Sequence, residues 1–172
     1  RSINKILNDT SSSGYVFRTD FRLRPNPSVT PICLSMDSAM RYYESLGRAW
    51  ERAAFIKARA CAGDINAGEV FLKKLRPFIW RKHLDFAAIK EAHDIRLKIK
   101  ENNLKNGDDN FFGRNIKLSE GGIRDIEFFA QTRQIIAGGR DDTLRSSKTC
   151  AALADLTKSG WVTEEDRDVL TK

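Results

Sequence analysis

Hydrophobic and polar residues alternate along residues 15–25, and this period of two is typical of a β-strand with one buried face. The apolar face carries Tyr15, Phe17, Thr19, Phe21 and Leu23, and the opposite face carries Val16, Arg18, Asp20, Arg22 and Arg24. Proline cannot donate a ladder hydrogen bond, so the run Pro25, Asn26, Pro27 ends the strand. The pattern predicts a strand that displays one carboxylate among arginines.

Later segments follow helical rather than strand periodicity. Ser35 or Asp37 can cap a helix that reaches about residue 46, and residues 50–53 read as helix. Residues 55–61 alternate well enough to be a strand. Further helices are expected at 66–75 before a break at Pro77, at 86–102 behind Asp85, at 123–137 before Gly138 and Gly139, at 147–158 and at 164–171.

The change in pattern at Gly63 and Asp64 marks the best internal boundary. Residues 106–110 are expected to be a polar loop, and residues 115–118 a short extended piece. We therefore expect an α+β protein. Residues 1–64 would form the later part of a mixed sheet, and residues 65–172 a mainly helical domain.

The 172 residues carry a net charge of +7, and most of it lies in residues 1–60, with ten Lys or Arg against five Asp or Glu. This excess would attract phosphate-rich ligands or an acidic partner, or it is a solvated basic surface; charge alone leaves both open. No apolar stretch approaches the ~20 residues that span a bilayer, so no membrane span is expected. The three widely spaced cysteines suggest neither a disulfide framework nor a zinc site, which favours a reducing cytoplasm.

The polar face of residues 15–25 is the feature that points most directly to chemistry. A carboxylate can hold a divalent metal while neighbouring arginines neutralise phosphate oxygens. A solvated ladder of salt bridges on an open sheet is the alternative, and it is the more frequent explanation of such a pattern standing alone.

Three motifs in order accompany this face: residues 18–25 (RTDFRLRP), residues 50–59 (WERAAFIKAR) and residues 116–128, which contain IKL and GGIRDIEF. Together they resemble the bifunctional enzymes that adenylylate and deadenylylate bacterial glutamine synthetase, and the resemblance covers nearly the whole chain. Residues 47–52 and 75–86 resemble the amino-terminal half of those enzymes. That half is associated with removing AMP from a glutamine synthetase tyrosine by phosphorolysis, which yields ADP.

The resemblance implies a nucleotidyltransferase core in which three carboxylates bind two Mg²⁺ ions. It places the third carboxylate at Asp20, with Arg22 and Arg24 contacting phosphate or supporting Asp20. The other two carboxylates belong to a G-S-…-D-x-D segment that these 172 residues lack. The chain begins with arginine, and we expect it to be cut from a longer protein and to be inactive alone. The resemblance also implies glutamine synthetase, the PII signal protein, nucleotide and phosphate as partners.

The second motif holds residues of two kinds. Trp50, Glu51 and Arg52 are expected to build a structural corner rather than to act in catalysis, because many ion pairs are only structural. Lys57 and Arg59 are spaced by two and would share a face of a strand, where they could extend the phosphate-binding wall.

The third motif begins with Gly121 and Gly122, which resemble a phosphate-binding turn before a helix, although a tight turn is the commoner explanation. Asp125 and Glu127 follow early in that helix, where acidic groups suit the helix dipole. For Glu127 we expect a buried ion pair that joins the helical part to the catalytic core, in preference to metal binding.

Two other classes of function remain open at this point. In the first, the chain is a non-catalytic regulatory module that binds glutamine synthetase or PII. In the second, it is a basic nucleic-acid-binding domain, which is disfavoured because its aromatic residues read as buried and no nucleic-acid motif occurs.

Overall fold

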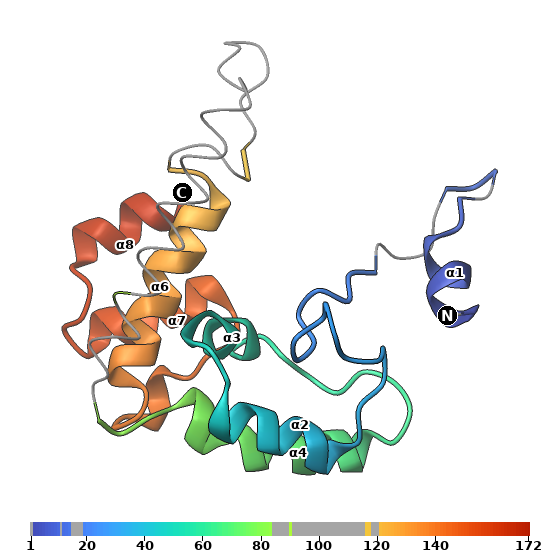
Figure 1. The fold of residues 1–172 in the computed structure, drawn as a ribbon. Coiled ribbons are helices and arrows are strands. Elements are labelled where there is room, and N and C mark those ends of the chain that lie inside the picture. The colour runs from blue at the N-terminus through green and yellow to red at the C-terminus, as the bar shows by residue number, and fades with distance from the viewer. Residues whose placement is uncertain (1, 11, 15–18, 84–89, 91–115, 118–120) are drawn as a thin grey trace. The chain divides into compact units, whose positions relative to one another are not determined.

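The computed structural model of the chain describes residues 2–10, 12–14, 19–83, 90, 116–117 and 121–172. These residues form helices and turns, and they contain no β-strand (Figure 1). They divide into two compact units, Arg1–Gly47 and Arg48–Lys172, which are described separately below. The helix expected at 86–102 and the loop expected at 106–110 lie outside the described residues.

The first unit contains helices α1 (Ser2–Asn8) and α2 (Met36–Ser45). The side chain of Ser35 accepts a hydrogen bond from the backbone N–H of Ser38, which satisfies one of the free donors in the first turn of α2. Ala39 and Tyr43 are the buried residues of α2, spaced by four as one helix face requires. The helix expected behind Ser35 is thus confirmed, with Ser35 rather than Asp37 as its cap.

The strand expected at residues 15–25 is wrong for the part that the structure describes, residues 19–25, which form irregular chain and turns. A strand needs a neighbour to receive its backbone hydrogen bonds, and none of the described residues supplies one. Side chains satisfy the backbone instead. The amide of Thr19 donates to Asn8 Oδ1 at 3.0 Å, and the amide of Arg22 donates to Asp20 Oδ1 at 2.9 Å. Residues 15–18 lie outside the described part.

The second unit opens with helices α3 (Ala49–Phe55) and α4 (Ile65–Ile79), which pack against each other. The strand expected at residues 55–61 is wrong: the chain leaves α3 through a turn and an irregular loop, with Ile56 buried in the core. The break expected at Pro77 is also wrong, because α4 continues to Ile79. Phe78 and Ile79 are 7% and 4% exposed, and their burial holds the last turn despite the proline.

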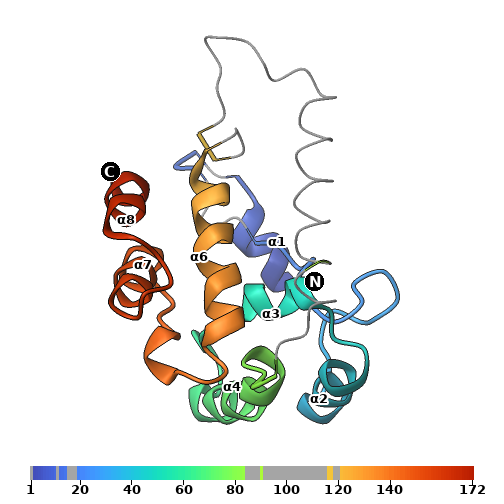
Figure 2. The same cartoon turned by 90° about the vertical axis from the view of Figure 1, so that its left-hand side faces the viewer.

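The remaining helices are α6 (Ile123–Ala137), α7 (Thr149–Lys158) and α8 (Glu164–Thr171), with a short 3₁₀ helix η1 (Asp142–Leu144). They confirm the three helices expected in this region. Figure 2 shows α7 and α8 on one side of α6 and α3 on the other. The buried side chains gather where these elements meet. The domain boundary predicted between residues 64 and 65 falls inside this second unit. That division into domains stays a prediction. The largest fully buried side chains are Leu75, Leu144, Leu153, Leu156 and Gln134.

Gln134 is a polar residue inside this core, at 1% exposure. Its side-chain amide donates to the carbonyls of Leu144 and Ser146, at 2.7 and 2.8 Å. These two bonds attach the loop around η1 to α6, which explains how the core accepts an amide group.

The Gln134→Leu variant is expected to lose about 2–3 kcal/mol of unfolding free energy, because two carbonyls near the core lose their donors while volume is roughly kept. Urea unfolding followed by circular dichroism measures the loss. Gln131→Leu, at a half-buried position on the same helix, is the matched control and should change stability by much less. Equal stabilities of the two variants would contradict a structural role for the buried amide.

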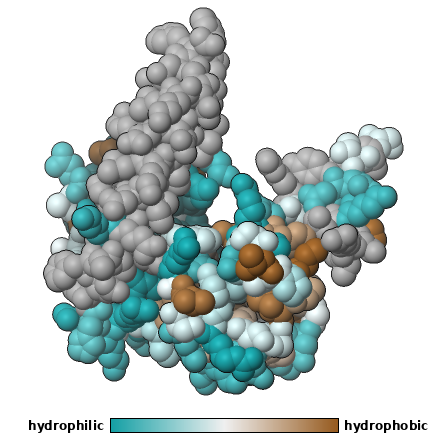
Figure 3. Space-filling model, in the orientation of Figure 1, coloured by the Kyte–Doolittle hydropathy of each residue, from teal (hydrophilic) through white to brown (hydrophobic). Residues whose placement is uncertain are grey.

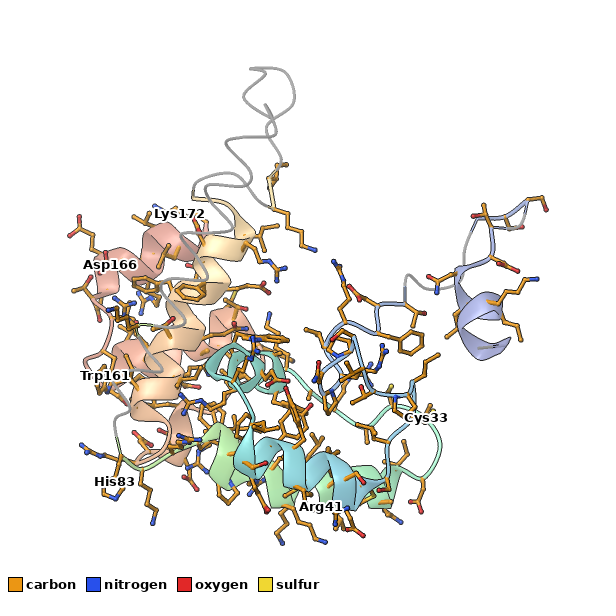
Figure 4. All side chains as sticks on the ribbon, in the orientation of Figure 1. Cys33, Arg41, His83, Trp161, Asp166 and Lys172 are labelled. Carbon is orange, nitrogen blue, oxygen red and sulfur yellow. The ribbon has the colours of Figure 1, made fainter. Side chains whose placement is uncertain are left out.

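The surface of the described residues is mixed. In Figure 3, hydrophobic residues appear as brown spots among hydrophilic ones. Cys33, labelled in Figure 4, is exposed and free, as are Cys61 and Cys150. No helix among the described parts of the chain combines the length and the apolar character that crossing a membrane needs.

Candidate functional site

Asp20 and Arg22 form a bidentate ion pair in the turn that follows residue 19. Arg22 Nη2 lies 2.6 Å from Asp20 Oδ2, and Arg22 Nε lies 3.0 and 2.9 Å from the two carboxylate oxygens. The side-chain hydrogen bond to Asp20, and then the charge of Asp20, raise the pKa of Arg22 above its usual value, so the guanidinium stays charged. Both side chains are exposed, at 46% and 85%, so solvent screens the pair and it contributes little to stability.

Arg24 organises the loop after Asp20. Its terminal nitrogens donate to the carbonyls of Phe21 at 3.0 Å, Pro27 at 2.8 Å and Thr30 at 3.3 Å. Its Nε atom is buried and has no hydrogen-bond partner, the one such side-chain atom found among the described residues. The guanidinium therefore closes the loop of residues 21–30, which follows Asp20. Its predicted contact with phosphate stays a prediction.

Magnesium prefers oxygen ligands such as carboxylates, phosphates and water. The Asp20 carboxylate has the right donor chemistry. However, no group of three histidine, cysteine or acidic side chains that could hold a metal occurs within the described ranges. The role of Asp20 as a metal ligand therefore stays a prediction.

Glu51 in the first turn of α3 and Arg52 in its last turn are buried, at 2% and 4% exposure. Glu51 Oε2 accepts a hydrogen bond of 2.7 Å from the backbone N–H of Arg48, the residue just before the helix. A carboxylate at this position satisfies a free donor and suits the positive end of the helix dipole. Trp50 is half-buried beside them. The Glu51 contact fits a structural corner, and the structural role expected for Trp50, Glu51 and Arg52 stays a prediction.

Lys57 lies just beyond the end of α3, and its ammonium group reaches two other helices. It forms an ion pair with Glu127 Oε1 on α6 and lies 3.2 Å from Thr149 Oγ1, the first residue of α7. The side chains of Lys57 and Glu127 are 40% and 27% exposed. An ion pair was expected for Glu127, and its partner in the structure is Lys57. The pair is partly exposed, whereas a buried pair was expected. Arg59, two residues further on, is exposed.

The amides around Gly121 and Gly122 are already occupied by groups of the chain. The N–H of Gly121 donates to Asp125 Oδ2 at 3.1 Å. The amides of Ile123 and Arg124, which open α6, donate to the carbonyls of residues 116 and 117 at 3.0 and 3.1 Å. A phosphate at this helix terminus would have to displace these bonds. The geometry therefore favours the tight-turn explanation, and Gly121 itself has a φ of 74°, which glycine adopts without strain.

The structure thus brings the predicted residues together in pairs: Asp20 with Arg22, Gly121 with Asp125, and Lys57 with Glu127. Asp20 and its arginines belong to the first unit, and Lys57 and Arg59 to the second. Thr149 is a contact that sequence reasoning missed. It lies 92 residues from Lys57, and no local pattern signals such a contact.

Two family models match the chain. Residues 1–74 match the model described as Glutamate-ammonia ligase adenylyltransferase, and residues 93–172 match the one described as GlnD PII-uridylyltransferase. Both names describe transferases of a nucleotidyl group, so the chain is related to nucleotidyltransferases.

Curated proteins that are similar to the whole length of the chain identify the family more specifically. The chain is 53% identical to the bifunctional glutamine synthetase adenylyltransferase/adenylyl-removing enzyme of Bartonella henselae, over 100% of the chain and 18% of that protein. The corresponding enzymes of Mesorhizobium japonicum and Agrobacterium fabrum are 49% and 52% identical over 100% of the chain and 17% of their length. The chain is thus homologous over its whole length to a segment of this bacterial enzyme family. The resemblance inferred from the three motifs is confirmed.

Proposed function

We propose that the chain is part of an enzyme that removes AMP from adenylylated glutamine synthetase by phosphorolysis. The observation that carries the proposal is the identity of 49–53% over the whole chain to relatives whose names include both adenylyltransferase and adenylyl-removing activity. The chain spans less than a fifth of the length of these relatives. The choice of the removing activity rests on the similarity of residues 47–52 and 75–86 to the amino-terminal half.

In the proposed reaction an oxygen of inorganic phosphate attacks the phosphorus of the AMP group. The bond between that phosphorus and the tyrosine oxygen breaks, the tyrosine oxygen takes up a proton, and ADP leaves. Positive side chains favour such a transfer because charge builds on the phosphate oxygens. Arg22 is the most exposed arginine of the loop and keeps its charge beside Asp20. We assign it, with Arg24 and Arg59, to contacts with phosphate.

We further propose Mg²⁺ as the cofactor, with Asp20 supplying one carboxylate ligand and the remaining ligands lying outside the described residues. A divalent cation would add positive charge next to the transferred phosphoryl group. Glutamine synthetase, the PII signal protein, nucleotide and phosphate are the proposed partners, and the cytoplasm is the proposed location.

The assay of this proposal compares the chain with a full-length enzyme that contains it. Adenylylated glutamine synthetase, phosphate and Mg²⁺ are incubated with either protein, and ADP release is measured. The full-length enzyme is expected to release ADP only when phosphate is present. The 172-residue chain is expected to release none, because one aspartate cannot organise two metal ions.

Each outcome of this assay is informative. ADP released by the chain alone would contradict the predicted need for further carboxylates. If the full-length enzyme releases no ADP, and a parallel reaction with unmodified glutamine synthetase and ATP forms AMP-tyrosine, the chain belongs instead to the adenylylating activity of the family.

The match of residues 93–172 to a PII-uridylyltransferase model favours one alternative, a regulatory role in PII signalling. In that case the chain would bind glutamine synthetase or PII without taking part in catalysis. Deletion of residues 93–172 from the full-length enzyme would then abolish its response to PII while leaving basal ADP release unchanged.

A further inference from the structure

We infer that Lys57 is a positioning residue, held by Glu127 and Thr149, and that it fixes the loop between α3 and α4 instead of binding phosphate itself. This inference rests on the proposed function, because the loop carries Arg59, one of the assigned phosphate contacts. Lys57 then holds the loop in place and is not itself a ligand of phosphate.

The loop is held at both ends and exposed between them. Ile56, at 7% exposure, anchors its start in the core, and the Asp64 carboxylate accepts the Ala67 amide at 2.9 Å at its end. Residues 57–59 and 61–63 are exposed. The side chain of Lys57 therefore attaches the first half of the loop to α6 and α7. This attachment fixes the direction in which the loop leaves the core.

The electrostatics explain why the carboxylate is required. Thr149 opens α7, and the positive end of a helix dipole disfavours an ammonium group placed there. Glu127 offsets this cost because its carboxylate contacts the same ammonium group. Without the carboxylate, Lys57 would be expected to leave this position for solvent, and the loop would lose its attachment.

The two roles of Lys57 make opposite predictions for the full-length enzyme. If Lys57 positions the loop, Lys57→Met and Glu127→Gln should each lower kcat for AMP removal by about 10- to 100-fold, since small displacements in a site have effects of this size. Any rise in the KM for phosphate should be the same in both variants, because both release the same loop and with it Arg59. The double variant should be no worse than either single variant, because both remove the same contact.

A ligand role predicts a different result. Lys57→Met would then raise the KM for phosphate by tenfold or more, and Glu127→Gln would not. Lys57→Arg should retain most activity under the positioning role, and the exchange Lys57→Glu with Glu127→Lys should recover part of it. Lys74→Met, which alters an exposed lysine on α4, is the matched control and should leave kcat unchanged.

A cross-linking experiment tests the contact itself on the 172-residue chain, with no need for activity. A carbodiimide joins an amine to a carboxylate that touches it, so mass spectrometry should find an amide between Lys57 and Glu127. The link should vanish in Lys57→Arg and persist in Lys74→Met. If no link forms in the unaltered chain, the positioning role is overturned even if the enzyme removes AMP. If the link forms but full-length protein releases no ADP, the proposed function fails and the contact stands.

Discussion

The Gly139→Ala variant is expected to lose more than about 3 kcal/mol of unfolding free energy, a loss typical of severe overpacking. A Cβ at this position would lie 1.9 Å from the carbonyl oxygen and 2.5 Å from the carbonyl carbon of Arg81. Both atoms belong to the backbone, so no rotation of a flexible side chain can relieve the clash. The segment from residue 80 to 82 would have to move away from the end of α6.

Neighbouring contacts oppose that movement. Arg140 Nε donates to the carbonyl of Lys82 at 3.2 Å, and the guanidinium of Arg145 lies 5.5 Å from the centre of the Trp80 ring. Arg145 Nε also donates to the carbonyl of Gly138 at 2.6 Å. The variant would disturb this whole contact, which joins the end of α4 to the end of α6.

Thermal unfolding of the chain, followed by circular dichroism, measures the effect as a fall in Tm of more than about 6 °C. Gly160→Ala is the matched control. Gly160 has a φ of 74° but open space around the added Cβ, so its variant should lose only about 1–2 kcal/mol. A Gly139→Ala variant that melts within 2 °C of the unaltered chain, on the scale of Tm shifts expected for a small loss, would contradict the close approach of Arg81.

The Asp20→Asn variant of the full-length enzyme is expected to lose AMP removal by about 100-fold or more, the size of effect seen when a group that stabilises a transition state is removed. Asparagine keeps the size of the side chain but removes the negative charge that a metal ligand contributes and that Arg22 contacts. The fold should be little affected, because the Asp20 and Arg22 side chains are exposed.

The measurement is phosphate-dependent ADP release, together with the Tm of each variant. Asp37→Asn, an exposed carboxylate in the first turn of α2, controls for the loss of one charge in the same unit. Activity of Asp20→Asn within tenfold of the unaltered enzyme would remove Asp20 from the proposed metal site. A large fall in Tm would show instead that the pair with Arg22 is structural.

Most of the described helices could be predicted because their signals are local, whereas α1 (Ser2–Asn8) was not predicted. Ser35 and Asp64 bond to amides three residues away, and Gly138 follows the last turn of α6. All of these lie within a few residues of the element that they delimit, so the order of residues is enough to reveal them. Motif order likewise identified the family before any geometry was known, and the roles of the candidate site residues stay predictions.

The errors arose where a distant part of the chain decides the outcome. Residues 19–25 alternate like a strand, but a strand forms only against a neighbour, and in the described chain the amide of Thr19 donates instead to the side chain of Asn8, 11 residues away. Pro77 reads as a helix break, but burial of Phe78 and Ile79 extends α4 past it. In both cases the local pattern was present and a tertiary interaction overrode it.

The sequence by itself determined the family, the helices of the second unit that the structure describes, and the choice of Asp20 as the residue to test. Only the tertiary structure decided that Lys57 contacts Glu127 and Thr149, which lie 70 and 92 residues away, and that Gly139 must lack a side chain. The physical reason is the range of the interactions. Caps and periodicity act within one or two turns, whereas an ion pair or a backbone contact between helices depends on packing that brings distant segments together.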